Sequence, residues 1–205
     1  MAMSLRIVVP PHPLIAHWLT MLRNSKTPPP LYATGFEEIG KWLTYEAIRD
    51  WLPNRQEKVE TETSETIGQV IESNIPLISI AFKAGGFQLW QGARNVLPNS
   101  NFSMNGIPQT IEKNAGLIVF IDQITTGEFT EKILCNLVEK GVDAKRLRLI
   151  TALSCSEGLK RIAETMPNLI IYCACIDSEL KDTDNINPGI GNPSLRLNTI
   201  ISSWQ

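Results

Sequence analysis

The residues best suited to chemistry form one short stretch, in which a carboxylate precedes a polar turn. Asp122 ends an apolar run over residues 117–121, and Thr125, Thr126 and Gly127 form the turn before a helix. Such a turn directs free backbone N–H groups and the positive end of the helix dipole toward the carboxyl edge of a sheet. Phosphate groups bind at this position in α/β folds, so the stretch is a candidate phosphate site.

The same stretch allows an interpretation without a ligand. Thr125 and Glu128 have the spacing of a capping box, in which two side chains satisfy the first N–H groups of the helix. Capping would use the donors that a phosphate needs. The carboxylate of Glu128 would also repel a phosphate, at a cost of roughly 1 kcal/mol in water and about 4 kcal/mol near a protein surface for charges about 4 Å apart. The pattern therefore favours a capped helix over a working phosphate site.

A strand and a helix must hold this turn, and the sequence predicts both. The run over residues 117–121 is apolar throughout and is typical of a buried strand. The helix after the turn is indicated by apolar residues at helical spacing and by a glycine that stops it. These residues are Ile133, Leu134, Leu137, Val138 and Gly141.

The rest of the chain repeats this alternation. Strands are expected over residues 5–9, 76–82, 147–155 and 169–176, with a last edge strand over 199–204. Helices are expected over residues 13–23, 35–51, 66–73, 88–96 and 156–166. Residues 56–65 are expected as a loop or exposed edge, and residues 97–115 and 178–198 as loops. This order predicts an α/β fold, a mostly parallel twisted sheet flanked by helices, with ligand chemistry at the carboxyl ends of its strands.

Composition limits the classes of function. The chain has 205 residues, 43% hydrophobic and 20% charged, which is enough for one large domain with its own core. A net charge of −2 gives no basic surface for nucleic acid. No apolar run approaches the roughly 20 residues of a membrane-spanning helix, and the N-terminus lacks the apolar core of a signal peptide. A cytoplasmic protein that does not span a membrane is therefore expected.

The four cysteines are interpreted as core thiols. Cys135, Cys155, Cys173 and Cys175 lie in predicted helices and strands, and none has the spacing of a zinc site. Cys173 and Cys175 would share one face of a strand. This arrangement favours buried thiols in a reducing compartment, and no metal site is predicted from side chains alone.

Three blocks of the sequence, taken together, resemble uracil phosphoribosyltransferases. The first is HPLIAHWLTMLR over residues 12–23, followed by LTYEA over 43–47, and the second is the KAG turn over 83–85. The third runs from residue 141 to about 198 and includes SEG at 156–158 and NPGIGN at 187–192. The resemblance covers nearly the whole chain. It implies a type I phosphoribosyltransferase fold in a single domain over residues 1–205, with an N-terminal helical or hood part to about residue 65 and a core sheet over about 66–205.

The resemblance also implies a reaction and its site. Members of the family transfer the phosphoribosyl group of 5-phosphoribosyl 1-diphosphate to uracil, giving UMP and diphosphate, with Mg²⁺ carried on the diphosphate donor. By resemblance, Asp122 and Lys83 are the candidate catalytic residues. The candidate loop for the phosphate and ribose comprises Thr125, Thr126, Gly127, Glu128 and Thr130, and the candidate uracil loop comprises Ile190, Gly191 and Asn192.

Four departures from the family pattern affect the same ligand. Glu128 replaces the second glycine of a loop that is also one residue short, and Lys83 replaces an arginine. Leu195 replaces an acidic residue after the uracil loop. The excursion after Leu97 is shorter than the family's arm, which carries an arginine and helps to build the family's dimer. Lysine keeps the positive charge of arginine but loses its two-pronged contact with phosphate oxygens.

These departures predict weak or lost activity. Two alternatives remain open beside a weakly active uracil phosphoribosyltransferase. One is a non-catalytic relative that binds a nucleotide or pyrimidine as a regulator, and the other is a structural subunit of a protein complex. Small nucleotides or pyrimidines are the expected ligands, and association with a second copy or with another protein remains open.

Overall fold

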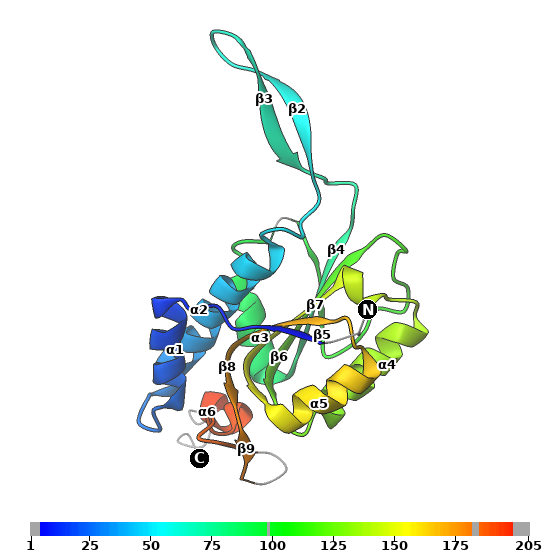
Figure 1. The fold of residues 1–205 in the computed structure, drawn as a ribbon. Coiled ribbons are helices and arrows are strands. Elements are labelled where there is room, and N and C mark those ends of the chain that lie inside the picture. The colour runs from blue at the N-terminus through cyan, green and yellow to red at the C-terminus, as the bar shows by residue number, and fades with distance from the viewer. Residues whose placement is uncertain (1–4, 98, 182–184, 199–205) are drawn as a thin grey trace.

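The computed structural model describes residues 5–97, 99–181 and 185–198, and the predicted edge strand over 199–204 lies outside them. At its centre is a six-stranded sheet in the order β1-β8-β7-β6-β4-β5, and all five pairings are parallel (Figure 1). The strands are β1 (Arg6–Val8), β4 (Leu77–Phe82), β5 (Asn101–Met104), β6 (Gly116–Ile124), β7 (Leu147–Cys155) and β8 (Ile170–Asp177). The predicted parallel α/β sheet is thus confirmed.

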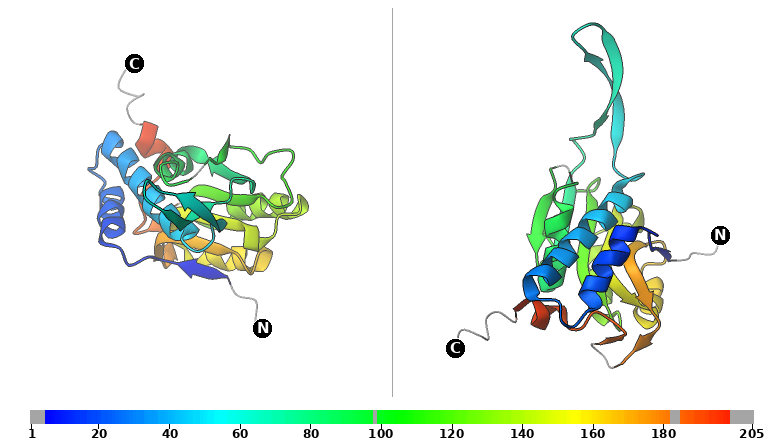
Figure 2. Two further views of the ribbon diagram at one scale, coloured as in Figure 1. Left: turned by 90° about the horizontal axis from the view of Figure 1, so that it is seen from above. Right: turned by 90° about the vertical axis from the view of Figure 1, so that its left-hand side faces the viewer.

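Helices cover both faces of this sheet (Figure 2). They are α1 (Pro13–Arg23), α2 (Pro29–Ile48), α3 (Lys83–Ala93), α4 (Glu128–Glu139), α5 (Ser156–Thr165) and α6 (Pro193–Asn198), with one 3-10 turn, η1 (Ala144–Arg146). Alternate residues of β6 face opposite layers, as the two-residue period of a strand requires. Ile118 and Phe120 pack with α1, α2 and α3, whereas Leu117, Val119 and Ile121 pack with α4 and α5.

The central strands form because their sequences are apolar enough to be buried on both faces. Every residue of β4 and of β7 is buried. Phe82 at the end of β4 pairs with Ile121 of β6, so the residues that follow them, Lys83 and Asp122, lie at neighbouring positions on the carboxyl edge of the sheet. The register thereby brings together two candidate residues that are far apart in the sequence.

Helices α2 and α3 approach one another closely because glycines line their contact. A Cβ atom on Gly40 would lie 2.0 Å from the Leu89 carbonyl oxygen, and one on Gly92 would lie 1.7 Å from the Glu37 carbonyl oxygen. No larger residue fits either position without moving a helix. This contact fixes α3, and therefore Lys83 at its start, against the rest of the molecule.

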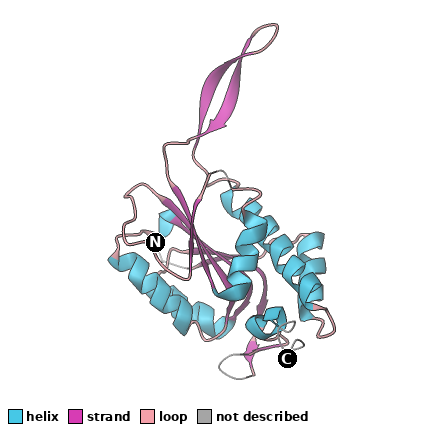
Figure 3. Ribbon diagram, turned by 180° about the vertical axis from the view of Figure 1, so that it is seen from behind, coloured by secondary structure: helices cyan, strands magenta, loops and turns pink. Residues whose placement is uncertain are grey.

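A long hairpin projects from the sheet and corrects one prediction (Figures 1 and 3). Strands β2 (Asn54–Glu60) and β3 (Glu65–Ile71) pair antiparallel from Asn54 with Ile71 to Glu60 with Glu65. The helix predicted over residues 66–73 is therefore wrong. The segment over 56–65, expected as a loop or exposed edge, holds most of the exposed strand β2 and the hairpin turn. Most of the hairpin side chains are exposed, so no buried stripe in the sequence marks the strands.

Other boundaries differ in smaller ways. Helix α3 begins at Lys83 instead of residue 88, and α2 begins at Pro29 instead of residue 35. The loop expected over 97–115 contains β5, and the loop expected over 178–198 contains α6 and a two-stranded sheet of β9 (Glu179–Leu180) and β10 (Ile186–Asn187). Cys155 and Cys173 are buried as predicted, but Cys135 is exposed, because it lies on the outer face of α4.

Candidate functional site

A polar hollow of about 600 Å³ lies at the carboxyl end of the central strands. It is lined by Lys83, Gln123, Thr125, Thr126, Gly127, Glu128, Phe129, Thr130, Lys132, Glu157 and Arg161. Six of these residues are candidates from the sequence, and the fold brings them to one place. In open α/β sheets ligands bind at this edge, so the polar hollow is the candidate site.

The N-terminus of α4 opens into the polar hollow without a side-chain cap. Gly127 is the N-cap residue, has a φ of 81° and has no side chain to accept a bond from the helix. The carboxylate of Glu128 accepts a hydrogen bond of 2.7 Å from the ammonium of Lys132. The predicted capping box is therefore wrong, because the helix begins after Gly127 and the i,i+4 pair with Lys132 competes for Glu128. The first N–H groups of α4 have no partner within their own helix, and the residues that carry them line the hollow.

The conformation of the turn is fixed by contact with α5. A Cβ atom on Gly127 would lie 2.7 Å from the Gly158 carbonyl oxygen, and one on Gly158 would lie 2.3 Å from the Thr125 carbonyl oxygen. The positive φ of Gly127 followed by helical backbone makes a concave row of N–H groups of the kind that holds anions. Two glycines from different elements thus hold the turn in an anion-binding shape.

Lys83 also lines the polar hollow. Its φ of 61° is rare for a residue with a side chain, and its backbone N–H donates to the Asn105 Oδ1 at 2.8 Å. The Lys83 ammonium lies 4.6 Å from the centroid of the Phe129 ring. Strained backbone of this kind is concentrated at functional sites. The aromatic contact holds a positive charge beside the start of α4.

Asp122 is close to the polar hollow but does not line it. Its exposed fraction is 2%, and a Cβ atom on Gly85 would lie 2.5 Å from the Asp122 Cβ. The Asp122 Oδ1 accepts a hydrogen bond of 2.8 Å from the Gln123 backbone N–H. Burial raises the pKa of Asp122, and the charge of Lys83 and the bond from Gln123 only partly oppose that rise. The fold thus encloses the carboxylate that the sequence singled out.

The segment over residues 189–192, which contains the candidate uracil loop, is held by an ion pair. The two Nη atoms of Arg23 donate to the two Asp177 oxygens at 2.8 Å each, and Arg23 also donates to the Gly189 carbonyl at 3.1 Å. The Gly189 N–H donates to the Asp177 Oδ2 at 3.0 Å. Burial disfavours the charged form of Asp177, but the Arg23 guanidinium and the Gly189 N–H together hold its pKa below the usual range.

A second clamp holds the same loop through the carbonyl of Ile190. The Tyr32 hydroxyl donates to this oxygen at 3.0 Å, and the Arg196 Nη1 donates to it at 3.0 Å. The Arg196 guanidinium lies 3.9 Å from the Tyr32 ring centroid. Asn192 uses its Oδ1 to accept from the Leu195 N–H at 3.2 Å. The protein therefore uses two of the polar groups in this loop itself, and Ile190 is buried.

Gln123 connects the two candidate loops. Its Nε2 donates to the Gly191 carbonyl at 3.5 Å, while the residue also lines the polar hollow. Sequence reasoning missed Gln123, as it missed Lys132, Glu157 and Arg161. The position of Gln123 beside Asp122 was an available signal, as was the i,i+4 spacing of Lys132 from Glu128. Glu157 and Arg161 become neighbours of this turn only through the packing of α4 on α5.

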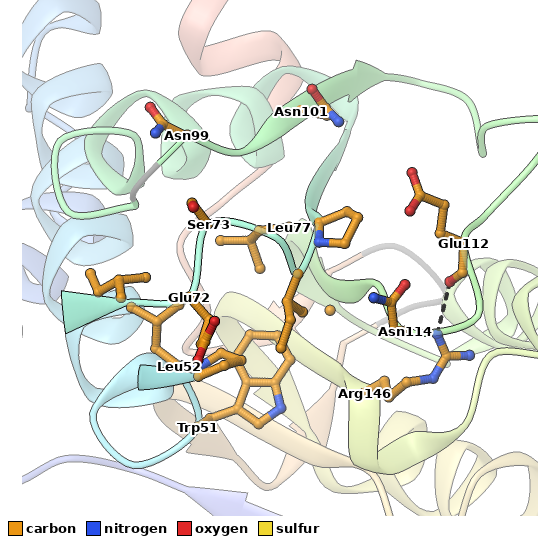
Figure 4. Close-up of a pocket in the computed structure, with 15 residues that line it drawn as sticks. Trp51, Leu52, Glu72, Ser73, Leu77, Asn99, Asn101, Glu112, Asn114 and Arg146 are labelled. Atoms are coloured by element: carbon orange, nitrogen blue, oxygen red, sulfur yellow. Dashed lines mark hydrogen bonds between the residues drawn. The ribbon is translucent and has the colours of Figure 1, made fainter. Parts of the chain in front are cut away.

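A second hollow, of about 470 Å³, lies at the opposite edge of the sheet, near the base of the hairpin (Figure 4). Its lining includes Trp51, Leu77 and Arg146. The Arg146 guanidinium is already bonded to the carbonyls of Glu112, Ala115 and Gly141, so it offers little to an anion. The catalytic and binding candidates of the sequence all lie elsewhere.

Comparison with known proteins identifies relatives over most of the chain. The sequence model of the family described as uracil phosphoribosyltransferase matches residues 9–198. A uracil phosphoribosyltransferase of Synechococcus elongatus is 34% identical, covering 96% of this chain and 98% of its own length, and one of Synechocystis sp. is 32% identical, covering 94% and 96%. The solved structure of the AQ2163 protein from Aquifex aeolicus has the same fold, with a TM-score of 0.83 and 24% identity, over 95% of this chain and 98% of that one. Within the residues that the structure describes, no helix is long and apolar enough to cross a membrane.

Proposed function

This chain belongs to the uracil phosphoribosyltransferase family, and we propose that it transfers the phosphoribosyl group of 5-phosphoribosyl 1-diphosphate to uracil at a low rate. The products of this reaction are UMP and diphosphate. The single observation that carries the proposal is the uncapped N-terminus of α4, which lines the polar hollow together with Lys83.

The arrangement supports a place for each charged part of the donor. The N–H groups at the start of α4 suit the 5′-phosphate, because a helix N-terminus attracts anions. Lys83 lines the same hollow and suits the diphosphate leaving group, whose developing charge a fixed cation stabilises. The loop over residues 189–192, held by the Arg23–Asp177 pair, suits uracil.

Two features support a low rate. Lys83 offers one compact charge, whereas an arginine would contact two phosphate oxygens in a fixed geometry. The Glu128 carboxylate stands at the rim of the polar hollow, and its negative charge opposes a phosphate even while it is paired with Lys132. Both features weaken the binding of the donor more than the binding of uracil.

In the proposed reaction Mg²⁺ is bound by the diphosphate donor. In the described part of the chain no group of three or more His, Cys, Asp or Glu side chains could hold a metal. Mg²⁺ is bound in many enzymes by one or two carboxylates together with substrate phosphates, and Glu128 and Glu157 both line the polar hollow. When bound, the metal would neutralise charge on the diphosphate, so the residues present fit a metal that arrives with its substrate.

The proposal is tested by measuring UMP formation from uracil, the diphosphate donor and Mg²⁺. We expect slow turnover that a Lys83→Met substitution abolishes. A Lys113→Met substitution, which removes an exposed lysine outside the polar hollow, should leave the rate unchanged. Absence of UMP at any enzyme concentration would contradict the proposed reaction.

A second candidate function is binding of UMP or a pyrimidine without turnover. It is favoured by the enclosure of Asp122, which leaves the predicted ribose carboxylate outside the polar hollow. Calorimetric titration of UMP together with the assay of UMP formation separates the two functions, because the regulator would bind UMP without forming it. A cytoplasmic location and an association with a second copy or another protein stay predictions.

A further inference from the structure

Lys83 differs in its partners from the other two basic residues that line the polar hollow in the described part of the chain. The Lys132 ammonium is paired with the Glu128 carboxylate at 2.7 Å. The Arg161 Nε lies 3.6 Å from the Glu131 Oε2. Over the residues that the structure describes, the Lys83 ammonium forms no ion pair with a carboxylate. Its positive charge is therefore available to an anion in the hollow.

The Lys83 ammonium instead lies over the Phe129 ring, 4.6 Å from its centroid. An aromatic face attracts an ammonium but does not cancel its charge as a carboxylate does. The ring is itself held in place, because it meets the Phe82 ring edge to face at a centroid distance of 5.8 Å. Phe82 is the last residue of β4 and is 7% exposed. Phe129 thus joins the first turn of α4 to the end of β4, directly beside Lys83.

The backbone of Lys83 is fixed by other contacts. Its N–H donates to the Asn105 Oδ1 at 2.8 Å, and the Asn105 N–H donates to the Ala81 carbonyl at 2.8 Å. These bonds leave the long lysine side chain to be ordered by its own contacts, and ordering such a side chain on binding costs conformational entropy. We propose that Phe129 is a positioning residue, which holds the Lys83 ammonium at the polar hollow and thereby strengthens binding of the diphosphate group of the donor.

This inference rests on the proposed function, which places the diphosphate at Lys83, but the contact itself can be tested without a ligand. The ring current of an aromatic side chain moves the NMR signals of groups above its face upfield. We expect the ε-methylene signal of Lys83, assigned by its loss in Lys83→Met, to lie upfield of the other lysine signals. Phe129→Leu should return it to the usual position. An unshifted signal in the wild type would overturn the inference and leave the proposed function intact.

The effect on binding is measured by calorimetric titration of diphosphate in the presence of Mg²⁺. Phe129→Leu keeps an apolar side chain without an aromatic face and should weaken binding by about two- to fivefold. Phe129→Tyr keeps the face and should bind as the wild type does. Phe102→Leu removes an aromatic ring on β5, outside the polar hollow, and should change nothing. Ribose 5-phosphate, which has no diphosphate, should bind Phe129→Leu and the wild type equally.

A double variant shows whether Phe129 acts through Lys83. In a Lys83→Met background, Phe129→Leu should cause no further loss of diphosphate binding. The same loss in both backgrounds, an equal loss for ribose 5-phosphate, or no loss in Phe129→Leu would overturn the positioning role, as would a loss in Phe129→Tyr. These outcomes leave the proposed function intact as long as UMP is formed. Failure of the wild type to bind diphosphate and to form UMP would contradict the proposed function together with this inference.

Discussion

The Glu128 carboxylate accepts a hydrogen bond of 2.7 Å from the Lys132 ammonium, one helical turn further along α4. Both side chains are largely exposed, at 60% and 72% respectively. The carboxylate is thus directed along the helix and not back over its N-terminus. The Lys132 ammonium also lowers the pKa of Glu128, so the residue stays ionised at neutral pH. A negative charge therefore stands at the rim of the polar hollow without blocking the N–H groups of α4.

Replacing this charge should strengthen anion binding modestly. We expect Glu128→Gln to raise the affinity for ribose 5-phosphate by about two- to fivefold, because exposed, screened charges interact by less than about 1 kcal/mol. Calorimetry at low and at moderate salt measures the change, which should shrink as salt rises. Glu139→Gln, at the far end of α4, removes the same charge away from the hollow. If Glu139→Gln raised the affinity equally, the gain would come from net charge. That result would contradict the explanation that the Glu128 charge acts locally at the hollow.

Lys83 should matter more for the diphosphate donor than for UMP. We expect Lys83→Met to weaken binding of 5-phosphoribosyl 1-diphosphate by about tenfold or more, since hydrogen bonds to charged groups contribute about 1.5 to 3 kcal/mol. UMP lacks the diphosphate, so its affinity should change less. Lys83→Arg should keep or improve donor binding. Equal losses for both ligands in Lys83→Met would place Lys83 at the 5′-phosphate instead of the leaving group.

The sheet and the neighbourhood of Lys83 and Asp122 could be predicted because they depend on local pattern. Apolar runs mark the central strands, and each run is followed by a polar turn whose residues must lie at the same edge. The same logic failed for the hairpin, since most of its residues are exposed, including Ile67 and Ile71 on β3. A strand that packs against no other element has no buried face, so its sequence shows no apolar alternation that would predict it.

The details of the site depended on tertiary geometry. The capping box failed because Gly127 is left-handed and starts the helix later than Thr125. Arg23 and Asp177 are 154 residues apart, and no sequence motif indicates that they form a pair. The enclosure of Asp122 follows from the approach of Gly85, which sequence spacing does not reveal.

Breaking the Arg23–Asp177 pair should destabilise the protein and disturb uracil recognition. Their side chains are 24% and 6% exposed, so Arg23→Met would leave a nearly buried carboxylate without its cation, at a cost of about 2 to 4 kcal/mol. Urea denaturation measures this loss, and the double variant Arg23→Met with Asp177→Asn should recover part of it. A double variant less stable than the single one would contradict the argument.

Because the folded-state pKa of Asp177 is lowered, the contribution of this carboxylate to the free energy of unfolding is present above about pH 4 and is lost as the pH falls further.

Asp122 should give the opposite dependence on pH. Burial raises its pKa in the folded state, so the folded protein binds this proton more tightly than the unfolded chain. The free energy of unfolding therefore loses the contribution of Asp122 as the pH rises from about 4 through the folded-state pKa. We expect the stability of Asp122→Asn relative to the wild type to increase over this window in urea denaturation. Glu139→Gln corrects for the change in net charge, and a relative stability that falls with pH would contradict the raised pKa.

The contact between α2 and α3 should tolerate no added carbon. A Cβ atom on Gly92 would lie 1.7 Å from the Glu37 carbonyl oxygen, and the obstacle is backbone, which cannot rotate away as a side chain could. We expect Gly92→Ala to lower the free energy of unfolding by about 3 kcal/mol or more, at or beyond the upper end of overpacking costs.

Gly106→Ala is the matched control for this substitution. The nearest atom to its added Cβ would be the Met104 carbonyl oxygen at 3.9 Å, an ordinary contact, so its stability should stay within about 0.5 kcal/mol of the wild type. Thermal and urea denaturation of both variants measure the difference in their free energies of unfolding. If Gly92→Ala were as stable as Gly106→Ala, the helices could separate at little cost, and α3 would not be the rigid support that places Lys83 at the polar hollow.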